Sequence, residues 1–273
     1  MIPPGSSGAT AGAERILDAF DSRRLIPPLS RDDPSLDEDG AYAIALEIYS
    51  RRVRRGEKPV GRKIGFTNRR TWVEYGVSAP IWGHVYDSTV RHARAGETRV
   101  PVGHLLQPRL EVEIQLHFAQ TPPVTRDEHA ILESIDWIAQ GFEIVQCPFP
   151  DWEFAGVDTI AAYAVHGALV VGAPVPVSEI EQCVDRLRGF EVVLSRDGAQ
   201  QARGVGANVL GSPLLAFAHL AEVLSAQSRF PPVQAGEIVS TGTLTGLAPV
   251  SPGEVWSTTI SGIDLPGSSI SIA

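Results

Sequence analysis

After Gly61 the chain consists of short apolar runs separated by glycine and proline, and full helices do not alternate with these runs. Runs of this kind are typical of β-strands bounded by turns. A doubly wound sheet needs a helix between successive parallel strands, so the pattern argues against that fold and favours an α+β protein with a mixed, strongly curved sheet. The expected strands are Gly61–Phe66, Leu110–Phe118, Gly141–Gln146, Ala164–Val171, Phe190–Arg196 and Glu237–Thr241.

The first 60 residues have a different pattern. We expect residues 1–8 to be a disordered tail and residues 9–60 to be a small helical part, followed by a mixed-sheet domain over residues 61–273. Apolar residues recur at helical spacing in both expected N-terminal helices, and Asp37 can cap the second of them. The expected helices are Ala9–Phe20, Asp37–Arg55, Arg69–Tyr75, Asp127–Ile138, Val177–Leu187 and Pro213–Ser225.

Charge and composition limit the partners. The 32 acidic and 23 basic residues give a net charge of −9, which argues against nucleic acid and anionic membranes. There is no signal peptide or uninterrupted membrane-spanning segment, so we expect a soluble, cytoplasmic protein without a membrane partner. Cys147 and Cys183 are too few for a disulfide framework and are expected to be reduced core thiols. Phosphate-loop, dinucleotide-binding, HExxH and GxSxG motifs are absent from the sequence.

The segment that suggests a functional site is Pro108–Phe118, in which polar and apolar residues alternate as in a β-strand. Residues at i and i+2 of a strand share a face and lie about 6.5–7 Å apart, so Glu111, Glu113 and Gln115 point the same way. Adjacent carboxylates on one face repel each other unless a cation or water separates them. The segment therefore indicates either a site for a hard divalent cation or an exposed edge strand.

A second segment and an unusual lysine count point towards the site. Glu143 is the single charge in an otherwise apolar strand, and a buried carboxylate must be paired or bind a metal; the alternative partner is an arginine such as Arg109. Three carboxylates with waters would suit Mg²⁺ or Mn²⁺. The chain has two lysines against 21 arginines, and Lys63 lies among apolar and glycine residues. A lysine in a chain that otherwise uses arginine can serve where a compact ammonium is needed, or where burial must shift the pKa of the cation.

With these residues in place, the chain resembles the hydratase/decarboxylase branch of the fumarylacetoacetate hydrolase superfamily, which includes 2-oxopent-4-enoate hydratase and 4-oxalocrotonate decarboxylase. The resemblance runs in order from about residue 40 to the C-terminus. The matching stretches are GRKIGFTN (61–68), QPRLEVEIQL (107–116), GFEIVQCPFPDW (141–152), DTIAAYAVHGALVVG (158–172), VLGSPLLAFAHLAEVL (209–224) and GEIVSTGTLTGLAPVSPGEV (236–255).

The resemblance implies a curved mixed β-roll with a helical N-terminal addition, usually in homo-oligomers. It makes Glu111, Glu113 and Glu143 the ligands of Mg²⁺ or Mn²⁺ and places Lys63 in the active site. It also implies that Thr241-Gly242-Thr243 lines the substrate pocket, and we expect Ile81 to bind substrate with them.

Two departures bear on the reaction. The hydratases have an aspartate 18 residues after the lysine, with a role in proton transfer, where this chain has Ile81; a decarboxylase relative is similar to this chain here. The hydratases also have Asn-Ala-Ser-Ser where this chain has Tyr163-Ala-Val-His166. His166 is therefore a candidate for the missing base, or a buried histidine with satisfied hydrogen bonds.

Together with these residues, the resemblance implies a divalent-metal-dependent lyase that acts on a short 2-oxo or 2-hydroxydienoic acid through a metal-bound enolate. A reaction like that of 2-oxopent-4-enoate hydratase fits the overall resemblance, and Ile81 favours the alternative of a 4-oxalocrotonate-type decarboxylase. A C–C hydrolase of acylpyruvates with His166 as base is a further alternative. The remaining one is a non-catalytic homologue that binds a 2-oxo acid.

Overall fold

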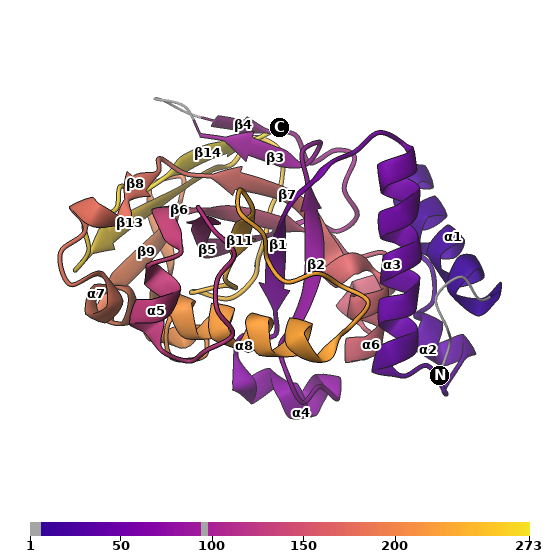
Figure 1. The fold of residues 1–273 in the computed structure, drawn as a ribbon. Helices are drawn as coiled ribbons and strands as arrows, with labels where there is room; N and C mark the ends of the chain where they lie inside the picture. The colour runs from indigo at the N-terminus through magenta and orange to yellow at the C-terminus, as the bar shows by residue number, and fades with distance from the viewer. Residues whose placement is uncertain (1–6, 94–97) are drawn as a thin grey trace.

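A computed structural model describes residues 7–93 and 98–273, and two sheets form its centre (Figure 1). Among the described residues the larger sheet has nine strands and mixes parallel with antiparallel pairs, which confirms the predicted α+β class. β12 (Ala248–Pro249) and β8 (Val175–Pro176) pair with β5 and β6 outside its main path. Along that path the order is β2 (Ile81–Tyr86), β1 (Pro59–Gly65), β11 (Ile238–Ser240), β5 (Arg109–Phe118), β6 (Ile135–Val145), β7 (His166–Val171) and β3 (Val90–His92).

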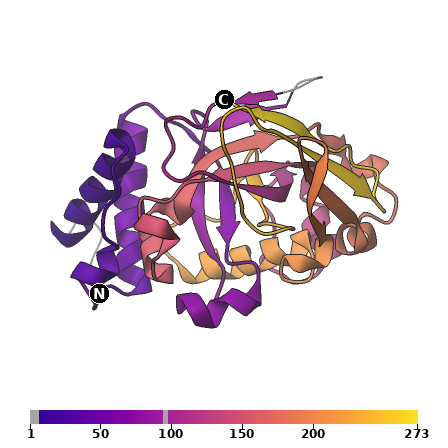
Figure 2. The ribbon, with the colours of Figure 1, turned by 180° about the vertical axis from the view of Figure 1, so that it is seen from behind.

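The second sheet has five strands and lies behind the first in the view of Figure 1, so it is best seen from the other side (Figure 2). Of its members only β9 was predicted, because the others are short, polar or rich in serine and threonine. The order is β10 (Ala199–Val205), β9 (Glu191–Arg196), β13 (Val255–Ser261), β14 (Ser269–Ile272) and β4 (Thr98–Val100).

The N-terminal helices pack beside the edge of the larger sheet formed by β2 (Figure 1). They are α1 (Ser7–Ser22), α2 (Leu29–Asp32) and α3 (Glu38–Arg54). The Asp37 side chain caps α3 by accepting a hydrogen bond from the Gly40 amide, and Tyr42 of α3 stacks on Trp82 of β2 at 5.7 Å. α1 begins two residues earlier than expected, so residues 7–8 are helical rather than part of a disordered tail. The rest of that expected tail, residues 1–6, lies outside the described residues.

The expected helix Asp127–Ile138 is wrong over its second half. The helix that forms is α5 (Glu128–Leu132), capped by the Asp127 side chain, and β6 begins at Ile135. β6 pairs with β5 along almost its whole length, with Ile138 opposite Leu116. The long ladder of backbone hydrogen bonds and the burial of both strands override the local helical spacing.

Of the other helices of the described chain, α8 and α4 lie below the sheets in Figure 1, α5 and α7 contact α8, and α6 packs against α3. α8 packs on β5, with the rings of Phe217 and Phe118 4.5 Å apart. By length and composition the stretch Gly206–Ala226, 56% buried in its most apolar window, resembles a membrane span. Positive φ angles at Leu210 and Gly211 break it, and the 14 residues of α8 fall short of the roughly 20 that a span needs, so we assign α8 as a core helix. These helices are α4 (Trp72–Tyr75), α5, α6 (Gly156–Ala161), α7 (Cys183–Gly189) and α8 (Pro213–Ala226).

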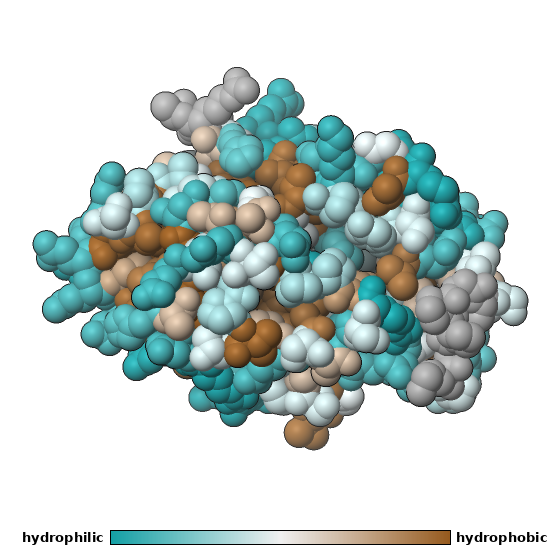
Figure 3. Space-filling view, in the orientation of Figure 1, coloured by the Kyte–Doolittle hydropathy of each residue, from teal (hydrophilic) through white to brown (hydrophobic). Residues whose placement is uncertain are grey.

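The surface in this orientation is mostly hydrophilic, with apolar side chains in separate small patches (Figure 3). Both cysteines are buried and free, as expected of core thiols.

Candidate active site

Three buried glutamates converge where β5 and β6 run side by side. Glu111 of β5 lies directly opposite Glu143 of β6, and Glu113 follows two residues along β5 on the same face. One carboxylate oxygen from each lies within 4.8 Å of the others. β5 is an interior strand and the three residues are at most 8% exposed, so the alternative of an exposed edge strand is wrong.

Lys63 reaches the same point from β1. Its Nζ lies 3.3 Å from Glu143 Oε2 and 4.0 Å from Glu111 Oε2, and it donates a hydrogen bond to the Ala164 carbonyl at 3.1 Å. β11, the strand between β1 and β5, has only three residues. The ammonium is therefore the cation of the carboxylate cluster, and Arg109, the partner considered for Glu143 from the sequence, does not pair with it.

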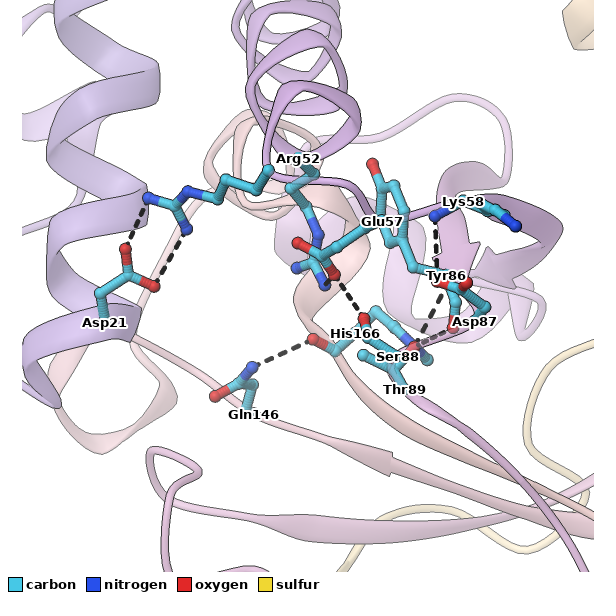
Figure 4. Close-up of polar contacts among 11 residues, drawn as sticks. Asp21, Arg52, Glu57, Lys58, Tyr86, Asp87, Ser88, Thr89, Gln146 and His166 are labelled. Carbon is cyan, nitrogen blue, oxygen red and sulfur yellow. Dashed lines mark hydrogen bonds and ion pairs between the residues drawn. The ribbon is translucent and has the colours of Figure 1, made fainter.

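His166 lies behind Glu143, away from the cavity described below. Its Nδ1 donates to Glu143 Oε1 at 2.8 Å, and its Nε2 is hydrogen-bonded to the Thr89 hydroxyl at 2.8 Å. The side chain is fully enclosed, and Figure 4 shows it among residues that follow α3 and β2, with Thr89 and Ser88 beside it. A histidine with both ring nitrogens engaged is well placed to orient a metal ligand.

The loop that follows β11 holds Glu113. The Ser240 hydroxyl and the Gly242 amide both donate to Glu113 Oε2, at 2.5 and 3.0 Å. The Thr241 hydroxyl donates to the Ile114 carbonyl at 2.9 Å. Gly242 has a φ of +97°, and a Cβ there would lie 2.2 Å from Thr67 Oγ1, so only glycine fits. Ser240 was not singled out from the sequence, although it directly precedes the predicted segment.

The donor set fits a hard divalent cation. Within the described part of the chain, Glu113 Oε1 is buried without a hydrogen-bond partner, and Glu143 Oε2 has only the ion pair with Lys63. Buried carboxylate oxygens left in this state are costly unless a cation binds them. All three candidate ligands offer oxygen, which is the donor that Mg²⁺, Mn²⁺ and Ca²⁺ prefer.

Burial and the neighbouring charges raise the pKa of two of the carboxylates and lower that of the third. Burial raises the pKa of Glu111 to about 7 and that of Glu113 well above its usual value. For Glu143 burial acts in the same direction, but Lys63 and His166 outweigh it and lower its pKa. Burial would lower the pKa of Lys63, but the three glutamates outweigh burial and raise it, so Lys63 is a charged ammonium in the metal-free protein.

The raised carboxylate pKa values predict that metal binding displaces protons. A cation binds the ionised site, so its affinity should fall as the pH drops below about 7, by about tenfold per pH unit for each proton displaced. Titration calorimetry with Mg²⁺ between pH 6 and 8, in buffers of different ionisation enthalpy, measures both effects. Without metal, the stabilising contribution of Glu111 is fully present below pH 4.5 and is lost as the pH rises through about 7. An affinity independent of pH would contradict this assignment.

A cavity of about 230 Å³ opens above the cluster. Lys63 and Glu111 line it, and so do two of the predicted substrate-binding residues, Ile81 and Thr243. The other two, Thr241 and Gly242, are not among its lining residues and instead support β5 and Glu113. The remaining walls are largely apolar and include Phe66, Val145, Trp152, Phe154, Val165 and Leu247.

Strained backbone forms one wall of this cavity. Tyr163, Ala164 and Val165 have φ angles of 43°, 57° and 53°, which is the left-handed region that residues with a side chain seldom adopt. Ala164 and Val165 line the cavity, and the Ala164 carbonyl accepts the bond from Lys63. Three such residues in succession cost on the order of 1–3 kcal/mol each, and strain of this kind clusters at functional sites. The segment is the one in which this chain departs from the Asn-Ala-Ser-Ser pattern.

Arg109 forms a further part of the cavity wall that was not predicted. Arg109 was considered only as a partner of Glu143, but it lines the cavity and its guanidinium lies over the ring of Trp152 at 4.3 Å. Its position two residues before Glu111 on the same strand face was a usable signal. Thr89, which bonds His166, lies 77 positions away along the chain and had no such signal.

Residues 79–265, about two thirds of the chain, match the family described as fumarylacetoacetate (FAA) hydrolase C-terminal. The chain belongs to this family. A 2-keto-4-pentenoate hydratase from Paraburkholderia xenovorans (strain LB400) is 32% identical over 257 residues, which cover 92% of this chain and 90% of that protein. A 2-hydroxyhexa-2,4-dienoate hydratase from Comamonas testosteroni is 30% identical over 253 residues, which cover 92% of each.

Among solved structures, the fold of this family member is similar to that of 4-oxalocrotonate decarboxylase from Pseudomonas putida G7 complexed with magnesium and adipate. The TM-score is 0.88, the sequences are 26% identical, and the match covers 97% of each chain. Hydratase and decarboxylase relatives over nearly the whole length make this family member an enzyme of the lyase type. The alternative of a non-catalytic homologue is set aside.

Proposed function

We propose that the protein is a divalent-metal-dependent lyase for a short 2-oxo or 2-hydroxydienoic acid, with Mg²⁺ or Mn²⁺ held by Glu111, Glu113 and Glu143. The observation that carries the proposal is the convergence of these three buried carboxylates with Lys63, beside a largely apolar cavity that Lys63 and Glu111 line. The bound cation would supply Lewis-acid stabilisation of negative charge on the substrate. Relatives that act on such acids are similar to this chain over nine-tenths of its length.

The chain's own residues bind and orient the substrate. The Lys63 ammonium, at the cavity floor, can donate a hydrogen bond to a substrate carboxylate or hold a proton at Nζ for the reacting carbon. The apolar walls exclude water from the reacting atoms and strengthen that interaction. Thr243 also lines the cavity and offers a hydroxyl, although in this structure it donates to the Gly246 carbonyl.

The reaction type depends on Ile81. This side chain is 4% exposed and lines the cavity, and it cannot transfer a proton. Hydration needs proton shuttles and a positioned water, whereas decarboxylation needs mainly stabilisation of charge and a dry pocket. A hydratase-like reaction agrees with the hydratase relatives described above, and decarboxylation is the second candidate because of Ile81 and the wall around it.

The hydrolase alternative is less well supported. It needs His166 to activate a water molecule, but both nitrogens of that ring are bonded to Glu143 and Thr89 and the ring is not among the cavity-lining residues. We propose that His166 positions Glu143 instead.

Metal-dependent turnover tests the proposal. With Mg²⁺ or Mn²⁺, the protein should consume 2-hydroxypenta-2,4-dienoate with loss of diene absorbance and no CO₂, or release CO₂ from 2-oxo-3-hexenedioate. Chelation with EDTA should abolish the reaction and added metal should restore it. Turnover that resists EDTA, or none with either substrate, would overturn the proposal. Pyruvate formed from an acylpyruvate would favour the hydrolase.

Substitution of His166 separates a positioning role from a base. His166→Ala should weaken Mg²⁺ binding by about 10- to 100-fold, because Glu143 loses the group that orients it, and His166→Asn should recover part of the affinity through its amide donor. Thr89→Val should act in the same direction with a smaller effect. Calorimetry measures the affinities. Unchanged affinity together with a lost limb in the pH profile of kcat would instead identify His166 as the base.

We also propose that the enzyme is a cytoplasmic homo-oligomer. Light scattering of the purified protein would test its oligomeric state.

A further inference from the structure

Arg52 of α3 is a largely buried cation outside the cavity, and its contacts lead towards the active site. Its side chain is 11% exposed, and its guanidinium lies over two tyrosine rings, 4.1 Å from the centre of Tyr86 and 5.2 Å from that of Tyr163. It is not among the residues that line the cavity. We infer that Arg52 is a positioning residue, which holds Tyr163 and thereby keeps the Ala164 carbonyl in contact with Lys63. This inference rests on the proposed function and adds to it a role for the N-terminal helical part.

Tyr163 begins the strained wall of the cavity. Its φ angle of 43° is the first of the three left-handed values at residues 163–165. Backbone in this region persists only where the surrounding structure holds it. The Tyr163 ring is buried and is held by two of the N-terminal helices, since Phe20 of α1 packs edge-on against it with ring centres 5.3 Å apart and Arg52 of α3 lies over it. These helices therefore help to maintain the conformation of the wall.

The backbone of Tyr163 is packed against the strand next to Lys63. Gly83 of β2 lies opposite Lys63 in the pairing of β1 with β2. A Cβ at Gly83 would lie 2.4 Å from the Tyr163 carbonyl oxygen, so the absence of a side chain permits this close approach. The next carbonyl group, that of Ala164, accepts the hydrogen bond from Lys63 Nζ at 3.1 Å. A shift of Tyr163 would therefore move the acceptor that orients the ammonium.

Arg52 also contacts the residues that support His166. Its Nη2 lies 2.6 Å from Glu57 Oε2, and the Ser88 hydroxyl donates to the same oxygen (Figure 4). The residue that follows Ser88 is Thr89, whose hydroxyl is bonded to Nε2 of His166. Arg52 thus supports the site through a second contact, on the turn that follows β2.

The stability of the fold does not by itself require an arginine at this position. The Nε of Arg52 is buried without a hydrogen-bond partner in the described chain, and a polar group left in this state carries a desolvation cost. A well-packed apolar side chain could fill the same space without that cost. A role in holding the strained wall accounts for the cation, because a guanidinium over a tyrosine ring is attracted to its face.

The two lysines of the chain provide a measurement that does not depend on turnover. Metal-free protein labelled with ¹³C-lysine should give two ε-methylene NMR signals, which Lys58→Arg assigns. In Arg52→Met the Lys63 signal should shift, because the ammonium loses its place at the Ala164 carbonyl, while the signal of the exposed Lys58 should not. Arg52→Lys should shift the Lys63 signal less, because it keeps a cation over the rings.

Activity of the Mg²⁺-loaded protein provides the second measurement. Arg52→Met should lower kcat/KM by about 10- to 100-fold, since displacement of a reacting group by about 1 Å can cost that much. Tyr163→Leu removes the ring that the guanidinium contacts and should act in the same direction, and the loss in the double variant should be smaller than the product of the two single losses. The matched control is Arg54→Met, because Arg54 is also on α3 and pairs with Glu47 but is exposed.

An unshifted Lys63 signal in Arg52→Met would overturn the inference, and so would an unchanged kcat/KM or a fully multiplicative loss in the double variant. Lower thermal stability without these changes would show a purely structural role and overturn it as well. If Arg52→Met did not fold, Arg52→Lys and Tyr163→Leu would carry the same comparisons. If the unsubstituted protein turned over no substrate, the proposed function would fail and the NMR measurement alone would decide the role of Arg52.

Discussion

Glu113→Gln should bind Mg²⁺ at least about 100-fold more weakly than the unsubstituted protein and lose lyase activity with it. Glu113 is one of the three clustered carboxylates, and its Oε1 is buried without a hydrogen-bond partner among the described residues. The amide keeps the shape of the side chain but removes the charge that binds a cation. Calorimetry gives the metal affinity, and the assays described above give the activity.

The same substitution should leave the metal-free fold intact. Burial and the neighbouring glutamates raise the pKa of Glu113 and so shift it towards its neutral form in the metal-free protein, which an amide imitates well. Thermal unfolding without metal should therefore be nearly unchanged, while the stabilisation produced by Mg²⁺ is lost. Glu128→Gln is the matched control, because Glu128 is also buried but bonds Arg188 and Ser212. Metal affinity retained in Glu113→Gln would remove Glu113 from the site.

Lys63→Met should abolish activity and lower the free energy of unfolding of the metal-free protein by about 3–5 kcal/mol near pH 8. Lys63 is the ammonium beside Glu143 and Glu111, and its loss leaves buried carboxylates without a cation. The loss of stability should be smaller near pH 5, because Glu111, with a pKa of about 7, is then protonated. Urea unfolding at the two pH values measures the difference.

Added metal separates the structural role of Lys63 from its catalytic role. Mg²⁺ supplies positive charge to the same carboxylates, so it should restore most of the stability of Lys63→Met but none of its activity. Lys58→Met is the control, since Lys58 is the only other lysine in the sequence and is exposed. Full activity in Lys63→Met would show that the ammonium serves only to balance the metal-free site.

Much of the sheet and the carboxylate cluster could be predicted because both follow from strand periodicity. Alternation places Glu111 and Glu113 on one face, and the apolar surroundings of Glu143 mark it as buried. The pairing of β5 with β6, which brings Glu143 opposite Glu111, depends on contacts remote in sequence. The same pairing explains why the predicted helix was wrong at residues 133–138. There the sequence has helical spacing, but β6 begins at Ile135 because it pairs with β5.

The surroundings of the cluster were harder to predict, because distant backbone and side chains set them. Nothing near His166 in sequence shows that Thr89 bonds its second ring nitrogen. The local sequence therefore cannot distinguish a catalytic base from a residue that orients Glu143. The left-handed backbone at residues 163–165 is maintained against local preference by its packing. Arg109 was visible in the sequence, but the position of its guanidinium over the Trp152 ring was not.

Anomalous diffraction from crystals soaked in MnCl₂, recorded on both sides of the manganese absorption edge, tests the central claim most directly. We expect one strong manganese peak in contact with carboxylate oxygens of Glu111, Glu113 and Glu143, with Lys63 displaced little or not at all. A peak bound by other residues, or no peak between β5 and β6 at millimolar Mn²⁺, would contradict the account.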